Sequence, residues 1–450
     1  MELLQWCNQK ILWGPPMLLL MLGCGLYLTW LTKGILFRKL GTVIRCTAGS
    51  LLRSSSRQKG SGAVSPFQAV STALAATVGT GNIVGVSVAI MQGGAGAVFW
   101  MWVSAFIGMM TKFSEVTLAV AYRQKNQRGE WTGGPMYYIS KGLGNKGLSL
   151  CFCVFGVLCS FGIGNMVQAN AMAGSLQQVF DIPCWMTGMV VALLAGLVLI
   201  GGMGRIANVT EILVPFMALF YMVSSVIVLV QQWQAIPQAF SMIFQQAFTV
   251  KSAAGGIMGA GVAQAVRIGV ARGIFTNEAG LGSAPIAHAS AQTDHPVKQG
   301  MWGAFEVFFD TIIMCTVTAL VLLSSNVFSA RGDGEEMIQM VFANAFVGGQ
   351  YVVPLGLTLF AFATVLAWYY YGARCMEYLA GNNAVAWYRG VYVILIFMGC
   401  VMKLSTVWEF ADFFNGLMAV PNLIALILLA PEVKKLTEDF FQGKGRYKIR

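Results

Sequence analysis

The stretch Thr77-Val78-Gly79-Thr80-Gly81-Asn82 places glycines and polar side chains inside an otherwise apolar segment, 66–91. A second interruption of this kind, Phe275-Thr276-Asn277-Glu278-Ala279-Gly280, lies in the segment 253–285. In hydrocarbon every backbone N–H and C=O group needs a partner, so a helix is interrupted at membrane depth only where it lines a cavity enclosed by protein. One interrupted helix in each half of the chain predicts the central site of a secondary transporter.

The composition places the chain in a membrane. Of its 450 residues, 57% are hydrophobic and only 10% are charged, whereas a soluble domain carries roughly 25% charged residues. Separate apolar stretches of about 20 residues recur along the chain, and each is long enough to cross a bilayer as a helix. We therefore expect a helical protein that crosses the bilayer many times, and a large soluble core is excluded.

The order of the apolar segments predicts the architecture. Eleven spans are expected, at 11–34, 66–91, 94–122, 147–176, 184–203, 207–231, 253–285, 299–325, 351–378, 388–403 and 405–430. Without the first span, ten remain as five plus five, and the two interrupted segments become the first helix of each half. An odd number of helices per half makes the halves run in opposite directions, which is an inverted repeat. The predicted fold class is an all-α polytopic membrane protein with eleven transmembrane helices, a five-plus-five inverted repeat and one extra N-terminal helix.

This order also divides the chain into parts. They are an extra helix with a basic cytoplasmic linker (1–62), a first five-helix repeat (63–235), a second five-helix repeat (236–431) and a basic cytoplasmic tail (432–450). Two further stretches, 236–249 and 334–348, are expected to form short helices on the outer face.

The lysines and arginines predict the orientation. The net charge is +11, and most of the positive residues fall in loops that share one side of the membrane. With the N-terminus outside, the outer segments hold only Lys10, Lys251, Arg331 and Lys403. Cytoplasmic loops carry the excess of positive charge, so the chain is predicted to have its N-terminus outside and its C-terminus in the cytoplasm. Because these charges follow the spans, they give no reason to expect nucleic acid as a partner.

Several other function classes find no support. The ten cysteines form no paired CxxC array, and His288 and His295 lack a third ligand, so no metal other than a coupling ion is expected. The chain has no nucleophile–base pair placed by spacing and no phosphate loop, which argues against an enzyme and against a cofactor. No filter sequence or ring of charge indicates a channel. No obligatory protein partner is evident.

The first interruption has the chemistry of a site for a carboxylate and for a cation. A broken helix presents free N–H groups, which suit a carboxylate, and free C=O groups, which suit a cation. Glycines permit the break and the close approach of a small ligand. Thr77, Thr80 and Asn82 add hard oxygen ligands, which suit Na⁺. Glycines that only pack one helix against another are the alternative reading.

The second interruption carries an acid. Glu278 lies inside a membrane segment, where an ionisable residue is costly and indicates function. It could contact a substrate amine or act as a protonatable group. The alternative is a structural ion pair with Arg267 or Arg272.

Further polar and aromatic residues lie within the spans. Hydrogen-bonded structural roles are favoured for Glu306 and Asp310. The run from Trp368 to Tyr371 suggests an interfacial aromatic belt. Thr364 and Trp368 lie four residues apart, so one helix face could carry an ion ligand and an aromatic wall.

Four motifs resemble the alanine or glycine:cation symporter family, the sodium:alanine symporters, and the resemblance covers roughly residues 10–440. They are Ser71-Thr72-Ala73-Leu74-Ala75-Ala76-Thr77-Val78-Gly79-Thr80-Gly81-Asn82-Ile83-Val84-Gly85, Gly133-Gly134-Pro135-Met136-Tyr137-Tyr138, Phe161-Gly162-Ile163-Gly164-Asn165 and Phe275-Thr276-Asn277-Glu278-Ala279-Gly280-Leu281-Gly282-Ser283-Ala284-Pro285. The resemblance implies a leucine-transporter-type fold with one extra helix in front.

The resemblance also implies site residues. Na⁺ would be held by carbonyl and hydroxyl oxygens of Ala75, Val78, Ala361 and Thr364. The amides of Thr80 and Gly81 would meet the substrate carboxylate. The whole expected substrate site comprises Gly79, Thr80, Gly81, Asn82, Gly164, Gln168, Phe275, Thr276, Asn277 and Trp368.

The expected function is Na⁺-coupled symport of small neutral amino acids, alanine or glycine first, by alternating access in the plasma membrane. The nearest alternative is the same fold driven by H⁺, with Glu278 as the carrier. A membrane sensor or channel that does not transport is the alternative from another class.

Overall fold

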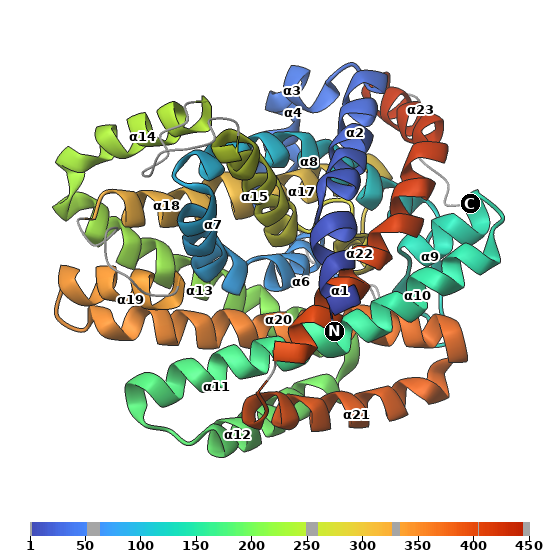
Figure 1. The fold of residues 1–450 in the computed structure, drawn as a ribbon. Coiled ribbons are helices and arrows are strands. Elements are labelled where there is room, and N and C mark those ends of the chain that lie inside the picture. The colour runs from blue at the N-terminus through green and yellow to red at the C-terminus, as the bar shows by residue number, and fades with distance from the viewer. Residues whose placement is uncertain (1, 52–63, 249–259, 326–333, 404, 444–450) are drawn as a thin grey trace.

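The computed structural model describes residues 2–51, 64–248, 260–325, 334–403 and 405–443, and nearly all of them are helical (Figure 1). Among these residues the one sheet is a hairpin in which β1 (Gln124–Lys125) pairs antiparallel with β2 (Trp131–Thr132), with Gln124 opposite Thr132. The predicted start of the seventh span, 253–259, and the end of the linker, 52–62, lie outside the described residues.

The helices follow one another with short connections. They are α1 (Glu2–Cys7), α2 (Pro15–Leu31), α3 (Ile35–Arg38), α4 (Leu40–Cys46), α5 (Ala48–Leu51), α6 (Pro66–Thr77), α7 (Val86–Gly93), α8 (Gly96–Ala121), α9 (Pro135–Tyr137), α10 (Lys146–Phe161), α11 (Val167–Phe180), α12 (Cys184–Leu199), α13 (Gly202–Gln231), α14 (Ile236–Phe248), α15 (Ala260–Asn277), α16 (Ala284–His288), α17 (Pro296–Val307), α18 (Thr316–Leu323), α19 (Gly334–Ala345), α20 (Val352–Ala380), α21 (Asn382–Val401), α22 (Ser405–Leu428) and α23 (Ala430–Phe441). Three π-helical segments matter below, namely η2 (Gly81–Gly85), η4 (Gly162–Met166) and η6 (Phe308–Cys315).

The chain is a multi-pass membrane protein. Within the described ranges, eight helical segments are long and apolar enough to cross a bilayer, and the bent pair Pro66–Thr77 and Gly81–Gly93 raises the number to nine. A helix lies in each of the predicted spans, but α12 has only 16 residues and α15 carries Arg267 and Arg272. The two short helices predicted outside the spans are present as α14 and α19.

The helices fall into two groups, which Figure 1 shows in its upper and lower halves. In the first group, α8 packs against α15, α17, α7 and α2. In the second, α20 packs against α10, α11, α13 and α21. The broken helix α6–α7 touches both, because α6 also packs on α13 and α20.

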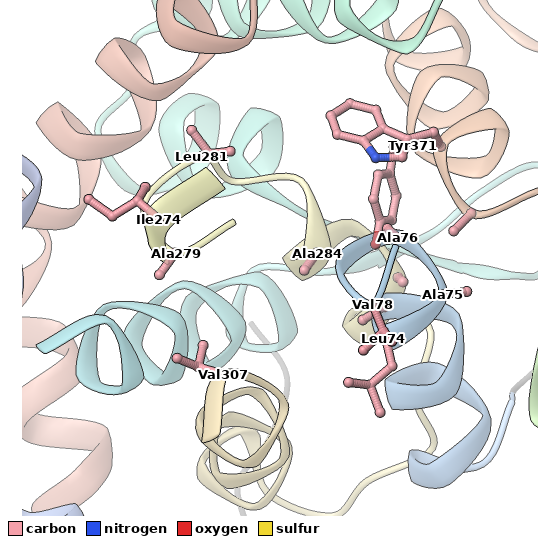
Figure 2. Close-up of a cluster of buried hydrophobic side chains, with 14 of the residues drawn as sticks. Leu74, Ala75, Ala76, Val78, Ile274, Ala279, Leu281, Ala284, Val307 and Tyr371 are labelled. Carbon is pink, nitrogen blue, oxygen red and sulfur yellow. The ribbon is translucent and has the colours of Figure 1, made fainter. Parts of the chain in front are cut away.

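Small apolar residues let the two breaks approach each other. Figure 2 shows them in one buried cluster with side chains of α17 and α20, the labelled residues being Leu74, Ala75, Ala76, Val78, Ile274, Ala279, Leu281, Ala284, Val307 and Tyr371. Close packing of this kind is how membrane helices associate when burial of apolar surface alone does not drive them together.

The predicted interfacial aromatic belt is wrong. The side chains from Trp368 to Tyr371 are at most 3% exposed. They face other helices because α20 is enclosed by α10, α11, α13, α21 and α6. The rings of Tyr388 and Tyr392 of α21 lie 5.5 and 5.3 Å from that of Tyr369, the first tilted against it and the second edge-on.

Replacing Gly372 by alanine is expected to destabilise the fold, because the new Cβ would lie 2.0 Å from Tyr388 Oη and 2.4 Å from Ser160 Oγ. Overpacking of this kind costs about 1–3 kcal/mol, so the thermal unfolding temperature in detergent should fall. Gly390→Ala in α21 is the control, since a Cβ there meets no atom within 4 Å. Equal unfolding temperatures for the two variants would contradict this account of the packing.

Candidate functional site

The first break separates α6 from α7 by a bend of 54°. Val78 is extended (φ −78°, ψ 94°), and the helix resumes as the wider π turn η2. The Gly79 N–H donates to Asn82 Oδ1 over 2.9 Å. No acceptor in the part of the chain that the structure describes takes a hydrogen bond from the N–H of Thr80 or Gly81. These two groups are free donors at the start of a half-helix, where an anion is favoured.

The second break follows α15 and has a left-handed backbone. Glu278, Gly280 and Gly282 have φ values of 54°, 95° and 81°. Glycine adopts such values without steric cost, whereas a glutamate there is uncommon and held by its surroundings. Asn277 stabilises the turn, since its Oδ1 accepts from the Ala279 N–H over 3.0 Å. The chain then enters α16 at Ala284.

A small cavity of about 30 Å³ lies between the breaks. The breaks also touch each other, since a Cβ on Gly81 would lie 2.8 Å from Thr276 Cγ2. Ten residues expected at the ion or substrate site, or as the coupling acid, line the cavity, and they are Thr77, Gly79, Thr80, Gly81, Gln168, Phe275, Thr276, Glu278, Thr364 and Trp368. The other lining residues are Ala76, Ile163 and Asn415.

Asn415 was not among the expected site residues. It lies in α22, is 2% exposed, and its Oδ1 has no hydrogen-bond partner among the described residues. A polar residue inside the apolar span 405–430 was the available signal. Gln168 Oε1 is likewise buried without a partner. Two unpaired carbonyl oxygens therefore lie at the cavity wall.

Oxygen atoms meet at the end of the first half-helix. The Thr364 hydroxyl lies 2.9 Å from the Ala75 carbonyl oxygen and 3.0 Å from that of Phe360. A Cβ on Gly79 would lie 3.2 Å from Thr364 Oγ1, so the glycine permits this approach. Val78 and Ala361 are fully buried beside these residues in the chain. Carbonyl and hydroxyl oxygens at a helix C-terminal end favour a hard cation.

Three expected substrate residues do not line the cavity but lie behind its wall. The Asn82 Nδ2 group donates to Asp310 Oδ1 at 2.7 Å, and that of Asn277 donates to Thr311 Oγ1 at 3.1 Å. Gly164 packs on Trp368, where a Cβ would come within 2.3 Å of the Trp368 Cβ. These residues hold the elements that form the cavity.

Glu278 lies at the cavity, and no arginine of the described ranges pairs with it. Its Oε2 accepts from the Ser283 hydroxyl at 2.5 Å, and Trp368 lines the same cavity. Among the described ion pairs, the membrane carboxylate that pairs with a lysine is Glu306, 3.5 Å from Lys112. The alternative role of Glu278, an ion pair with Arg267 or Arg272, is therefore not found among the described residues.

Two broken helices around a small polar cavity, in a multi-pass helical protein, define a secondary transporter. The profile of the Sodium:alanine symporter family matches residues 1–448. The chain belongs to this family, whose class of activity is amino-acid:cation symport rather than enzymatic catalysis.

Known relatives agree with this assignment. The Sodium/alanine symporter AgcS of Methanococcus maripaludis is 42% identical over 439 residues, which cover 96% of this chain and 95% of that protein. The Probable sodium/glutamine symporter GlnT of Bacillus subtilis is 37% identical over 96% of this chain and 89% of that protein. Among solved structures, MhsT in complex with L-phenylalanine has a TM-score of 0.61 at 13% identity, over 82% of this chain and 90% of that chain. The last likeness shows the leucine-transporter-type fold alone.

The contact between Gly164 and Trp368 predicts a sensitive position. Gly164→Ala should push the indole out of place and lower the affinity for alanine at least about fivefold, the lower end of an overpacking cost of ~1–3 kcal/mol. Equilibrium binding of radiolabelled alanine to purified protein measures the change. Gly174→Ala, in the following helix α11, is the control because a Cβ there meets no atom within 4 Å. An unchanged affinity in Gly164→Ala would contradict the prediction that the position of Trp368 controls binding in the cavity.

Proposed function

We propose that this protein is a Na⁺-coupled symporter of small neutral amino acids, with alanine and glycine as the first candidates. The observation that carries the proposal is the contact of the Thr364 hydroxyl with the Ala75 carbonyl at the first break, next to a cavity of about 30 Å³. The ion and the amino acid would thus bind side by side on the same interrupted helix.

The substrate carboxylate would bind the free N–H groups of Thr80 and Gly81. They begin the second half-helix, whose dipole favours an anion there. The ammonium group would donate to Gln168 Oε1 and Asn415 Oδ1, the unpaired acceptors of the cavity. Hydrogen-bonding capacity for both charged ends supports an α-amino acid rather than an amine or an acid alone.

The walls would select a short side chain. Trp368, Phe275 and Ile163 occupy the space around the cavity, and Gly164 holds Trp368 in van der Waals contact. Overlap rejects a larger substrate more strongly than a missing methylene rejects a smaller one. This favours alanine and glycine over glutamine, the substrate in the name of one relative.

The cation would be coordinated by oxygens of Ala75, Val78, Ala361 and Thr364. Neutral oxygen ligands without an anionic cage suit Na⁺. The names of the relatives, sodium/alanine and sodium/glutamine symporter, support the same ion.

Transport would proceed by alternating access. Eleven spans, with ten of them in an inverted repeat and the N-terminus outside, would place the cavity near the middle of the plasma membrane. The group of α6–α8 and α15–α17 would rock against α10–α13, α20 and α21, which form the other group in Figure 1. The parts of the chain would be the extra helix and linker, the two repeats and the tail expected from the sequence.

Uptake of radiolabelled alanine into liposomes that contain the purified protein tests the proposal. An inward Na⁺ gradient should drive concentrative uptake, and Thr364→Ala should lower the apparent Na⁺ affinity at least about tenfold because it removes one ion ligand. Thr358→Ala is the control, since its hydroxyl binds only the Pro354 carbonyl in the same helix, at 2.7 Å. The assignment of the ion would be overturned if uptake did not depend on Na⁺. It would also be overturned if Thr364→Ala had the same apparent Na⁺ affinity as Thr358→Ala.

A second candidate is symport with H⁺, and the observation that favours it is the Glu278 carboxyl group at the cavity. Glu278→Gln keeps the size of the side chain but removes the titratable group. Under Na⁺ coupling, the variant should retain uptake driven by Na⁺ in the same liposomes. Uptake driven by an H⁺ gradient in the wild type, and lost in Glu278→Gln, would instead favour the second candidate.

A further inference from the structure

A buried hydrogen-bond chain leads from the first break to η6. Asn82 Oδ1 is occupied by the Gly79 N–H, so the Asn82 amide nitrogen points away from the break. This nitrogen donates to Asp310 Oδ1 at 2.7 Å and to the Asp310 carbonyl oxygen at 3.1 Å. Asn82 and Asp310 are both fully buried. The π-helical backbone of η6 supports the second bond, because such a turn departs from the regular α-helical pairing.

A matching chain leads from the second break to the same turn. Asn277 Oδ1 is occupied by the Ala279 N–H, so its amide nitrogen faces η6. It donates to Thr311 Oγ1 at 3.1 Å, and the Thr311 hydroxyl lies 2.8 Å from Asp310 Oδ2. Asn277 and Thr311 are fully buried as well. Asp310 and Thr311 therefore join two breaks that lie about two hundred positions apart in the sequence.

The direction of every bond in the chain follows from the two backbone donors. Each N–H group faces the oxygen of an asparagine amide, which fixes that amide with its nitrogen toward η6. Thr311 accepts from Asn277, so its own hydrogen is directed to Asp310. The Asp310 carboxyl group thus accepts from Asn82 of the first break at Oδ1 and, through Thr311, is linked to Asn277 of the second break at Oδ2.

We propose that Asp310 and Thr311 are positioning residues that couple the two breaks, so that Na⁺ binding and amino-acid binding strengthen each other. This inference rests on the proposed function. The expected ion ligand Val78 directly precedes Gly79, and Ala75 lies four residues before it. Thr276 and Glu278 of the cavity flank Asn277. If one break is held in the conformation that keeps its link to Asp310, the position of Asp310 is fixed. The other break is then favoured in the conformation that also keeps its own link to Asp310. Coupling of this kind is a measurable ratio of affinities.

The experiment compares two changes of threonine to valine in the same membrane span. Thr311→Val removes the hydroxyl that links Asn277 to Asp310. Thr318→Val is the matched control, because Thr318 is also fully buried and its hydroxyl binds Tyr221 at 2.8 Å, away from both breaks. Radiolabelled alanine binding to purified protein is measured without Na⁺ and at saturating Na⁺. The ratio of the two dissociation constants is the coupling factor.

Thr311→Val should lower the coupling factor about fivefold or more, within the usual range of such couplings. Thr318→Val should leave it at the wild-type value, and Thr311→Ser, which keeps a hydroxyl, should restore it. Wild-type coupling in Thr311→Val, or an equal loss in both valine variants, would overturn the proposal. If Thr311→Val does not fold, Thr311→Ala and Thr318→Ala take the places of the valine pair.

The same data separate this inference from the proposed function. If the wild-type affinity for alanine does not depend on Na⁺, then Na⁺ coupling fails, and the ratio is read between acidic and neutral pH instead. If this ratio of dissociation constants falls in Thr311→Val but not in Thr318→Val, the positioning role is supported with H⁺ as the coupled ion. If Thr311→Val keeps the wild-type ratio, the positioning role is overturned.

Discussion

The need to pair every backbone polar group inside the membrane shapes this protein. Two helices are interrupted at that depth, and each interruption needs partners. Asparagine side chains supply part of them, Asn82 to the Gly79 N–H and Asn277 to the Ala279 N–H. Among the described residues, the N–H groups of Thr80 and Gly81 stay unpaired, and both residues line the cavity. The proposed binding site would therefore use backbone groups that the fold leaves free.

One straight helix positions both breaks. In α20, Thr364 contacts the first break through the Ala75 carbonyl, and Trp368, one turn later, lines the cavity together with Glu278 of the second. Gly164 of η4 allows α20 to approach closely at this level. Because α20 belongs to the second group of helices, motion between the groups would change the contacts at both breaks together.

The N-terminal segment before α2 lies next to the site. Asn8 donates to Glu409 Oε2 at 2.9 Å, and Trp13 donates to the Asp412 carbonyl at 3.0 Å, so this segment is tied to α22. The Trp13 ring lies 5.8 Å from that of Phe275, a lining residue of the cavity. A larger cavity of about 500 Å³ is also lined by Phe275, with arginines and carboxylates in its wall. The N-terminal segment thus forms part of the surroundings of Phe275.

The sequence by itself determined the membrane class, the positions of the helices and the two breaks, because hydropathy and glycine placement act locally. Only the tertiary structure decided which polar side chains face the cavity. Asn82 and Asn277 lie behind its wall, Asn415 is part of it, and the tyrosines after Trp368 are buried instead of lying at the interface. These outcomes depend on how separate segments of the chain pack together, as Asn82 shows with its partner Asp310, 228 positions later. Local sequence patterns report whether a residue is apolar or helical, but a hydrogen-bond partner on another helix is chosen by packing.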